Sequence, residues 1–207
     1  MPMDYIVFDS SVKILIVSPH PDDEVIGCGG IMLKYGPQCD VLLITDGCNG
    51  HRYWTEDRTR RIRKSEFLQV MHQCNVNNYF YLGIKDRTVN GYFDIYSIIN
   101  VDNYDVVFVP NKRETHPDHK AAYNQLLVHA ITHFTNWDVY QYEVWSPLTT
   151  PTHIIDLSTN FDEKASLLSN YKSQVDELNY IEAIRGLNIY RGETNHMKYA
   201  ECFTKGY

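Results

Sequence analysis

The sequence predicts an α/β fold, a Rossmann-like three-layer αβα sandwich built around a mostly parallel sheet. Short runs of β-branched and other apolar residues alternate along the chain with longer segments of helical character, which is typical of parallel strands joined by helices. The 207 residues contain no internal repeat, low-complexity tract or Gly/Ser-rich linker. We therefore expect a single domain over residues 1–207.

The elements of the first half follow from apolar runs and helical spacing. The β-branched run at 12–17 and the apolar run at 41–45 are typical of buried parallel strands. Between them, residues 24–35 are expected to form a helix despite three glycines. The charged segment 55–74 places its apolar residues on one helical face, and the short run 79–82 is expected to be the next strand.

The second half continues the same alternation. A weaker helix is expected at 92–100, and the fully apolar strand 106–109 follows it and is ended by Pro110. A helix is expected from Pro117 to about Phe134, because proline suits the first turn of a helix. The last third is expected to add strands near 139–144 and 153–156 and helices near 162–171 and 176–190.

Composition and charge restrict the classes of function. The formal net charge of −7 argues against nucleic acid or an anionic membrane surface as a partner, and no apolar run reaches membrane-spanning length. The start of the chain lacks the features of a secretory signal. Five irregularly spaced cysteines favour reduced thiols and a cytoplasmic location. The basic stretch 58–64 is interpreted as a solvated helix face, with a lip that meets a substrate phosphate or carboxylate as the alternative.

One polar segment directly follows a predicted strand, and a second lies shortly beyond another. Residues 18–24 are Ser-Pro-His-Pro-Asp-Asp-Glu, and residues 116–119 are His-Pro-Asp-His. Ligands bind at the carboxyl ends of parallel strands, so we expect the two segments to meet there. Two histidines and one carboxylate form the ligand set of a catalytic zinc site, and His20, Asp23 and His119 supply it. Fe²⁺ accepts the same ligands, so the sequence leaves Zn²⁺ and Fe²⁺ open.

These segments resemble the motifs of the PIG-L/LmbE-like zinc deacetylases, which act on N-acetylglucosaminyl compounds. The resemblance covers most of the chain through further, individually weak matches: Thr45-Asp46-Gly47, Arg63 to Glu66, Tyr81 to Asp86, Lys164, Tyr171 to Gln174, Arg191-Gly192 and Tyr199 to Phe203. It implies a Zn²⁺-dependent hydrolase that removes the acetyl group of a small amino-sugar substrate, with the metal held by His20, Asp23 and His119.

The resemblance also implies roles for the other motif residues. Asp22 matches the general base, and His116 matches the residue that stabilises the oxyanion and assists the leaving amine. Asp118 matches the carboxylate that orients His116 and would favour its imidazolium form. Arg63 and Asp86 match substrate-binding positions.

One loop departs from the family pattern. Cys48 and Asn49 stand where the family usually has a glutamate soon after the glycine that follows the second strand. His51 lies in the same loop and is expected to border the site. The roles of these three residues stay open at the level of sequence.

Other functions also stay open at this stage. A deacetylase of another N-acyl sugar, from glycan or natural-product biosynthesis, would use the same residues. A metal- or sugar-binding module is disfavoured because binding alone needs neither Asp22 nor His116. A dinucleotide-binding protein is disfavoured because the glycines at 27–30 lack the G-x-G-x-x-G spacing. The sequence does not distinguish a monomer from a homo-oligomer, and it does not identify the aglycone or the pathway.

Overall fold

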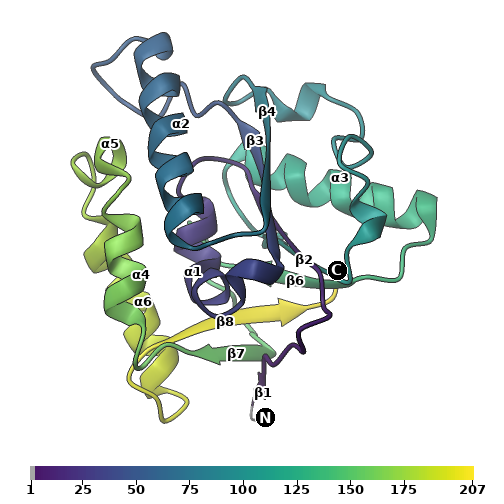
Figure 1. Cartoon of the computed structure of the whole chain (residues 1–207), viewed down its shortest axis with the longest axis vertical. Helices are drawn as coiled ribbons and strands as arrows, with labels where there is room; N and C mark the ends of the chain where they lie inside the picture. The colour runs from purple at the N-terminus through teal and green to yellow at the C-terminus, as the bar shows by residue number, and fades with distance from the viewer. Residues whose placement is uncertain (1–2) are drawn as a thin grey trace.

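The computed structural model describes residues 3–207 and confirms the α/β architecture, with a mixed sheet between two layers of helices (Figure 1). Within these residues the sheet has eight strands in the order β1-β7-β8-β6-β5-β2-β3-β4. All pairings are parallel except those of β8, which runs antiparallel to both β6 and β7. The sheet is therefore mostly parallel, as the alternating pattern predicts.

The strands of the parallel part are the expected apolar runs. They are β2 (Ile14–Ser18), β3 (Cys39–Thr45), β4 (Asn78–Ile84), β5 (Val106–Pro110) and β6 (Asp138–Tyr142). The remaining strands are β7 (His153–Asp156), which was expected, and β1 (Asp4–Tyr5) and β8 (Ala200–Lys205), which were not. The strand β8 was not predicted because Glu201 interrupts its apolar pattern, and this carboxylate is buried against Lys164 at 2.6 Å.

The helices cover both faces of the sheet. They are α1 (Asp23–Tyr35), α2 (Glu56–Gln73), α3 (Pro117–His133), α4 (Phe161–Leu168), α5 (Lys172–Val175) and α6 (Tyr180–Glu193). Helices α1, α2, α4 and α6 lie on one side of the sheet, and α3 lies on the other (Figure 1). No helix among residues 3–207 has both the length and the apolar character needed to cross a membrane.

Two expected helices differ in the structure. Residues 92–100 form turns instead of a helix, because Asp94 and Asn100 each have a φ of 50°, which a right-handed helix excludes. The Asp94 carboxylate also accepts the backbone N–H of Ser97 at 3.2 Å, which competes with helical hydrogen bonding. The helix expected at 176–190 starts later, at Tyr180, after a turn that follows α5.

The apolar core is divided by the sheet into two parts. Ile16 of β2 packs in the core beneath α1, α2 and α4, and its neighbour Val17 packs in the core beneath α3. This alternation follows from strand geometry, which sends successive side chains to opposite faces. Both faces of β2 are covered, so its five residues are all buried. The carboxyl end of β2 is thereby fixed in the middle of the molecule, where the polar segment 18–24 begins.

Candidate active site

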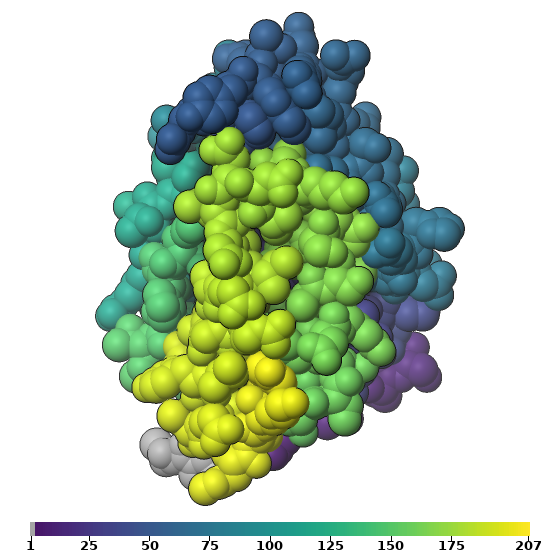
Figure 2. Space-filling view, turned by 90° about the vertical axis from the view of Figure 1, so that its left-hand side faces the viewer, coloured from purple at the N-terminus to yellow at the C-terminus, as the bar shows by residue number. Residues whose placement is uncertain are grey.

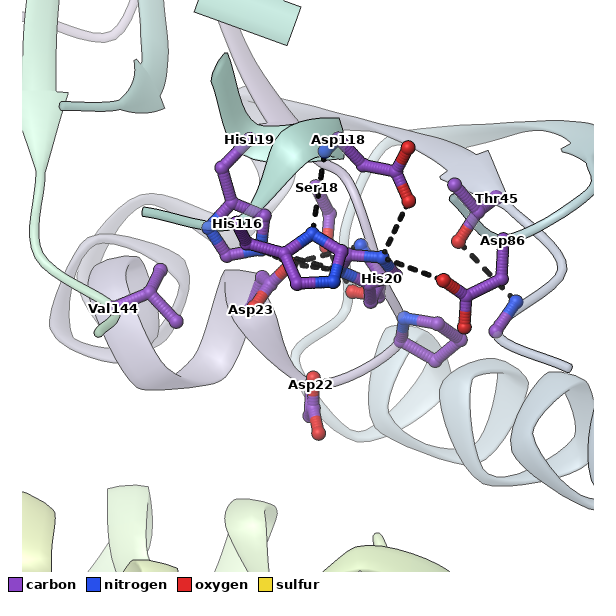
Figure 3. Close-up of polar contacts among 12 residues, drawn as sticks. Ser18, His20, Asp22, Asp23, Thr45, Asp86, His116, Asp118, His119 and Val144 are labelled. Carbon is purple, nitrogen blue, oxygen red and sulfur yellow. Dashed lines mark hydrogen bonds and ion pairs between the residues drawn. The ribbon is translucent and has the colours of Figure 1, made fainter. Parts of the chain in front are cut away.

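The two polar segments meet at the carboxyl ends of β2 and β5, in the positions that the sequence predicts (Figure 3). His20 lies in the turn that follows β2, and Asp23 is the first residue of α1. His119 lies in the first turn of α3, which starts at Pro117 because the missing N–H of proline costs no hydrogen bond there. Two helix starts therefore aim these three side chains at a common point.

The donor atoms of His20, Asp23 and His119 form a compact triangle. His20 Nδ1 lies 3.1 Å from His119 Nε2 and 3.2 Å from Asp23 Oδ2, and His119 Nε2 lies 3.0 Å from Asp23 Oδ2. Donors held about 2.0–2.1 Å from a tetrahedral zinc ion are about 3.3 Å apart. All three side chains are buried. The donor types and their spacing therefore fit Zn²⁺, and they equally suit Fe²⁺.

Charge in the triangle favours a bound cation. Burial opposes protonation of His20, but its hydrogen bonds to Asp118, Asp23 and Asp86 outweigh burial and raise the pKa of His20 well above its ordinary value. Burial likewise acts to raise the pKa of Asp23, but His119 and His20 overcome it and hold that pKa well below its usual range. The carboxylates thus attract positive charge to this point, as a proton or as a metal ion.

Each imidazole of the triangle has a carboxylate at its other nitrogen. His20 Nε2 lies 3.1 Å from Asp118 Oδ2 and 3.4 Å from Asp86 Oδ1 (Figure 3). His119 Nδ1 lies 3.4 Å from Glu114 Oε2. Carboxylates in these positions fix the orientation of metal-binding imidazoles and increase their basicity. The surroundings of the triangle therefore fit a metal site as well as the triangle itself does.

Glu114 is a functional candidate that the sequence reasoning missed. Its side chain is fully buried, and Oε1 accepts the backbone N–H groups of Val144, Trp145 and Ser146 at 3.0–3.2 Å. Within residues 3–207, neither its Oε2 nor His119 Nδ1 has a hydrogen-bond partner, and these two atoms face each other. The available signal was an acidic residue between a buried strand and the His-Pro-Asp-His segment.

Asp118 lies in a different place from the one that the resemblance implies. Its carboxylate accepts the backbone N–H groups of Arg87 and Val89 at 2.7 and 3.2 Å, and its other side-chain contact is with His20. Its contact with His116 runs through the backbone, because the Asp118 N–H donates to His116 Nδ1 at 3.3 Å. The carboxylate thus orients His20, and the expectation that it orients His116 is corrected.

His116 lies beside the triangle. Its ring centroid is 4.6 Å from that of His20 and 5.1 Å from that of His119. Burial and the neighbouring imidazoles of His20 and His119 lower the pKa of His116 to about 4, and Asp118 offsets this only in part. This direction is opposite to the one expected from Asp118 alone, so the surroundings of His116 disfavour a resting imidazolium.

Asp22 faces the cavity without a capping role. It is the N-cap residue of α1, with a φ of 118° that is strained for a residue other than glycine, and its side chain makes no capping hydrogen bond. Its Oδ2 lies 3.3 Å from Arg63 Nη2. Burial raises the pKa of Asp22 to about 8, although Arg63 opposes the rise. Contact with Arg63 favours the carboxylate form that a general base needs, whereas burial opposes it.

Arg63 is buried in the cavity wall, and its guanidinium is already engaged. It donates to the carbonyl oxygens of Pro21 and Gly47 at 2.6 and 3.2 Å, in addition to its contact with Asp22. These bonds hold the turn after β2 against the loop after β3. Nearby Arg60 pairs with acidic groups, including Asp46 at 3.4 Å, which agrees with a helix face rather than a free cationic lip.

Asp86 lies on the opposite side of His20 from the triangle. Its Oδ2 accepts the backbone N–H of Asn49 at 3.1 Å, and its Oδ1 faces His20 Nε2. Burial acts to raise the pKa of Asp86, but the contact with His20 prevails and lowers it to about 2. Asp86 is therefore an anion that joins the unusual loop at Asn49 to the histidine.

A cavity of about 490 Å³ opens beside these residues. It is lined by His20, Asp22, Asp23, Arg63, Asp86 and His116, and by Asn49, Gly50, His51, Arg52, Arg87, Trp145, Gln174, Glu177, Leu178 and Tyr180. Its outer wall forms where the loop after β3 meets the segment after α4: Gln174 Nε2 donates to the Gly50 carbonyl at 3.0 Å, and His51 lies 3.6 Å from Glu177. Figure 2 shows this face, with the blue segment above the green-to-yellow helices. His51 borders the cavity as the sequence predicts.

A family model described as GlcNAc-PI de-N-acetylase (PIG-L) matches residues 15–131, which is more than half of the chain. The chain belongs to the PIG-L family. Membership of the PIG-L family indicates an N-deacetylase, a hydrolase that cleaves an amide bond. The match includes both polar segments and therefore the whole donor triangle.

Solved structures share the fold over nearly the whole chain. N,N'-diacetylchitobiose deacetylase from Pyrococcus horikoshii has a TM-score of 0.77 at 22% identity, covering 94% of this chain and 83% of its own. The conserved protein TT1542 from Thermus thermophilus has a TM-score of 0.76 at 23% identity, covering 93% and 94%. GalB, the 4-carboxy-2-hydroxymuconate hydratase from Pseudomonas putida, has a TM-score of 0.74 at 18% identity, covering 95% and 97%. Because a hydratase shares the fold, the fold alone does not fix the reaction.

Proposed function

We propose that the chain is a metal-dependent deacetylase that hydrolyses the N-acetyl group of an N-acetylglucosamine-type sugar or glycoconjugate. The observation that carries the proposal is the buried donor triangle of His20, Asp23 and His119, with Asp22 and His116 beside it in one cavity. Membership of the PIG-L family supports the reaction. The shared fold of N,N'-diacetylchitobiose deacetylase is consistent with an acetamido sugar as the substrate.

The triangle would hold Zn²⁺, with Fe²⁺ as the alternative. When bound, the ion supplies a Lewis acid and lowers the pKa of water in the site to about 7. Asp118 and Glu114 keep the imidazoles of His20 and His119 directed at the ion through their outer nitrogens. The protein contributes a rigid, buried set of donors that does not need to reorganise.

The remaining residues move protons and stabilise charge. Asp22, held by Arg63, takes a proton from the attacking water as the new bond to the acetamide carbon forms. His116 donates a hydrogen bond to the carbonyl oxygen, and loss of one such donor typically costs about 10²–10³ in rate. The proton that Asp22 took then passes to the nitrogen, assisted by His116, as the C–N bond breaks, which releases acetate and a free amine.

The proposal also covers the partners of the enzyme and the compartment in which it works. The small amino-sugar substrate reaches the site through the cavity and needs neither nucleic acid nor a membrane as a partner. All five cysteines are buried and unpaired by disulfides, which supports a reducing compartment such as the cytoplasm.

The direct test is amine release from a panel of N-acetylglucosamine derivatives, measured before chelation, after chelation and after return of Zn²⁺ or Fe²⁺. We expect release to disappear with the chelator and to recover with one of the ions. Release that continues unchanged in the metal-free protein would contradict the proposal. No release from any member of the panel by the metal-loaded protein would favour a binding module instead.

A further inference from the structure

A second cluster of metal-binding side chains lies at the far end of α3 from the donor triangle. Asp94, His129 and His133 each place one donor atom within 4.8 Å of the donor atoms of the other two. His129 stands ten residues after His119 on the same helix, which is about 15 Å along the helix axis at a rise of about 1.5 Å per residue. The cluster is therefore separate from the site of the proposed reaction.

The two histidines of the cluster lie four residues apart on one face of α3. This is the spacing at which two imidazoles on a helix share a zinc ion. The rings of His129 and His133 are stacked, with centroids 4.0 Å apart and planes inclined by 19°. His133 Nδ1 lies 3.0 Å from the His129 carbonyl oxygen. A hydrogen bond from Nδ1–H to that carbonyl fixes the tautomer and leaves Nε2 of His133 as a metal donor.

His129 is buried between two carboxylates. Its Nδ1 lies 2.9 Å from Asp94 Oδ1, and its Nε2 lies 3.5 Å from Asp102 Oδ1. Within residues 3–207, Nε2 has no hydrogen-bond partner. A neutral imidazole carries one N–H, so either tautomer turns a nitrogen lone pair toward a carboxylate. These two acceptors repel each other unless a cation lies between them, either a second proton on the ring or a metal ion.

The Asp94 side of the imidazole suits a metal ion. The 2.9 Å between His129 Nδ1 and Asp94 Oδ1 is close to the separation of about 3.3 Å between donors on a tetrahedral zinc ion. Ser97 holds the Asp94 carboxylate in place, through its N–H to Oδ1 and its hydroxyl to Oδ2. On the other side, Asp102 accepts the indole N–H of Trp137 at 3.3 Å. Asp102 thus has the position of a carboxylate that orients a metal-binding imidazole.

A hollow of about 450 Å³ opens over the cluster, and all three residues are in its wall. The hollow gives an ion a path from solvent and leaves room for water as a further ligand. His133 is exposed, so its side chain is free to rotate toward the other two donors. The fixed pair of Asp94 and His129 would bind the ion first, and His133 would then close over it.

We propose that Asp94, His129 and His133 form a second metal site, which binds Zn²⁺ or a similar divalent transition-metal ion and links the segment 92–100 to the end of α3. Imidazole ligands favour such ions over Mg²⁺ and Ca²⁺. The segment is already tied to α3 one turn earlier, because Gln125 Nε2 donates to the Val89 and Tyr92 carbonyls. An ion at the cluster would add a bond at the next turn of the helix.

The test is a calorimetric titration of the protein with Zn²⁺ after gel filtration. One ligand of the second site is exposed, so its ion should be lost on the column, whereas a buried ion in the donor triangle should stay. We expect one further equivalent of Zn²⁺ to bind, and excess Mg²⁺ not to displace it. His133→Ala should abolish this equivalent. His72→Ala, which removes an exposed histidine from the last turn of α2, is the matched control and should retain it.

A second variant tests the carboxylate behind His129. Asp102→Asn keeps an oxygen for the Trp137 indole but removes the negative charge that faces His129 Nε2. It should weaken binding of the further equivalent by about 10- to 100-fold. Unchanged affinity in Asp102→Asn would overturn the assignment of Asp102 as the orienting carboxylate.

Hydrogen exchange distinguishes this site from adventitious binding at the surface. Added Zn²⁺ should slow the exchange of backbone amides in the segment 92–100 of the wild type and should have no such effect in His133→Ala. Three results would overturn the inference: no further equivalent in the wild type, as expected if a proton occupies the cluster, a further equivalent that persists in His133→Ala, or binding that leaves the exchange of 92–100 unchanged. None of these results bears on the deacetylase function, because the donor triangle shares no residue with the cluster.

Discussion

At the scale of residues, buried carboxylates organise the site. Asp118 and Glu114 each face the outer nitrogen of one imidazole, His20 and His119 respectively, and each also accepts backbone N–H groups from a neighbouring loop. An imidazole without such a partner would be free to rotate or to change tautomer. The two carboxylates therefore fix both the chemical state and the direction of the donor atoms.

Replacing the Glu114 carboxylate by an amide tests whether its charge orients His119. We expect Glu114→Gln to weaken Zn²⁺ binding by about 10- to 100-fold, because the amide keeps an oxygen for the backbone N–H groups but presents a neutral group to His119. Competition with a chromophoric chelator measures the affinity. Glu163→Gln, on the exposed side of α4, serves as the matched control. An unchanged affinity in Glu114→Gln would show that Glu114 only supports the loop.

Contacts between individual side chains are only partly predictable from the sequence. His20, Asp23 and His119 stand in recognisable segments, so their meeting could be predicted before the structure. The partner of each carboxylate could not be predicted, because it depends on side-chain rotamers and on loops such as the one at Arg87. For that reason the sequence pattern predicts a different partner for Asp118 and no role for Glu114.

At the scale of elements, the apolar strands were predictable and the polar ones were not. β2, β3 and β5 are buried on both faces, so their apolar runs are continuous. The strand β8 carries Glu201, which is tolerated inside the protein because it pairs with Lys164 and accepts the Gly30 N–H. The segment 92–100 has helical spacing, but local turn conformations prevail over that spacing.

The close packing of α1 against the sheet gives an element-scale prediction. A Cβ atom on Gly27 would lie 2.0 Å from the ring of Tyr142, whose hydroxyl donates to the Val17 carbonyl at 2.6 Å. Gly27→Ala should therefore lower the free energy of unfolding by about 1–3 kcal/mol. It should also weaken metal binding, since Asp23 lies one turn away on α1. Thermal and urea unfolding measure the first effect.

Gly186→Ala is the matched control for that prediction. Gly186 lies in α6 with no atom within 4 Å of an added Cβ, so alanine there should raise stability by about 0.5–1 kcal/mol. Equal destabilisation by both substitutions would contradict the packing argument. A loss of stability in Gly27→Ala together with a gain in Gly186→Ala would attribute the loss to the contact between α1 and the sheet.

At the scale of the whole molecule, the chain beyond the matched family segment completes the site. The family match ends at residue 131, and later residues supply Trp145, Gln174 and Tyr180 to the cavity. Lys164 ties this part to α1, because its Nζ donates to the Ile26 carbonyl at 2.9 Å and pairs with Glu201 of β8. The position of α1, and with it that of Asp23, thus depends on contacts from the part of the chain that follows the matched segment.

The central claim is that His20, Asp23 and His119 hold the metal ion of a deacetylase in which Asp22 is the base. The most direct test measures metal content and amine release on the same samples of wild type, Asp22→Asn and His119→Ala. We expect the wild type to hold one ion and to release amine and acetate in equal amounts. Asp22→Asn should keep the ion and lose turnover, and His119→Ala should lose both. Unchanged metal content in His119→Ala, or near-normal release by Asp22→Asn, would contradict the account.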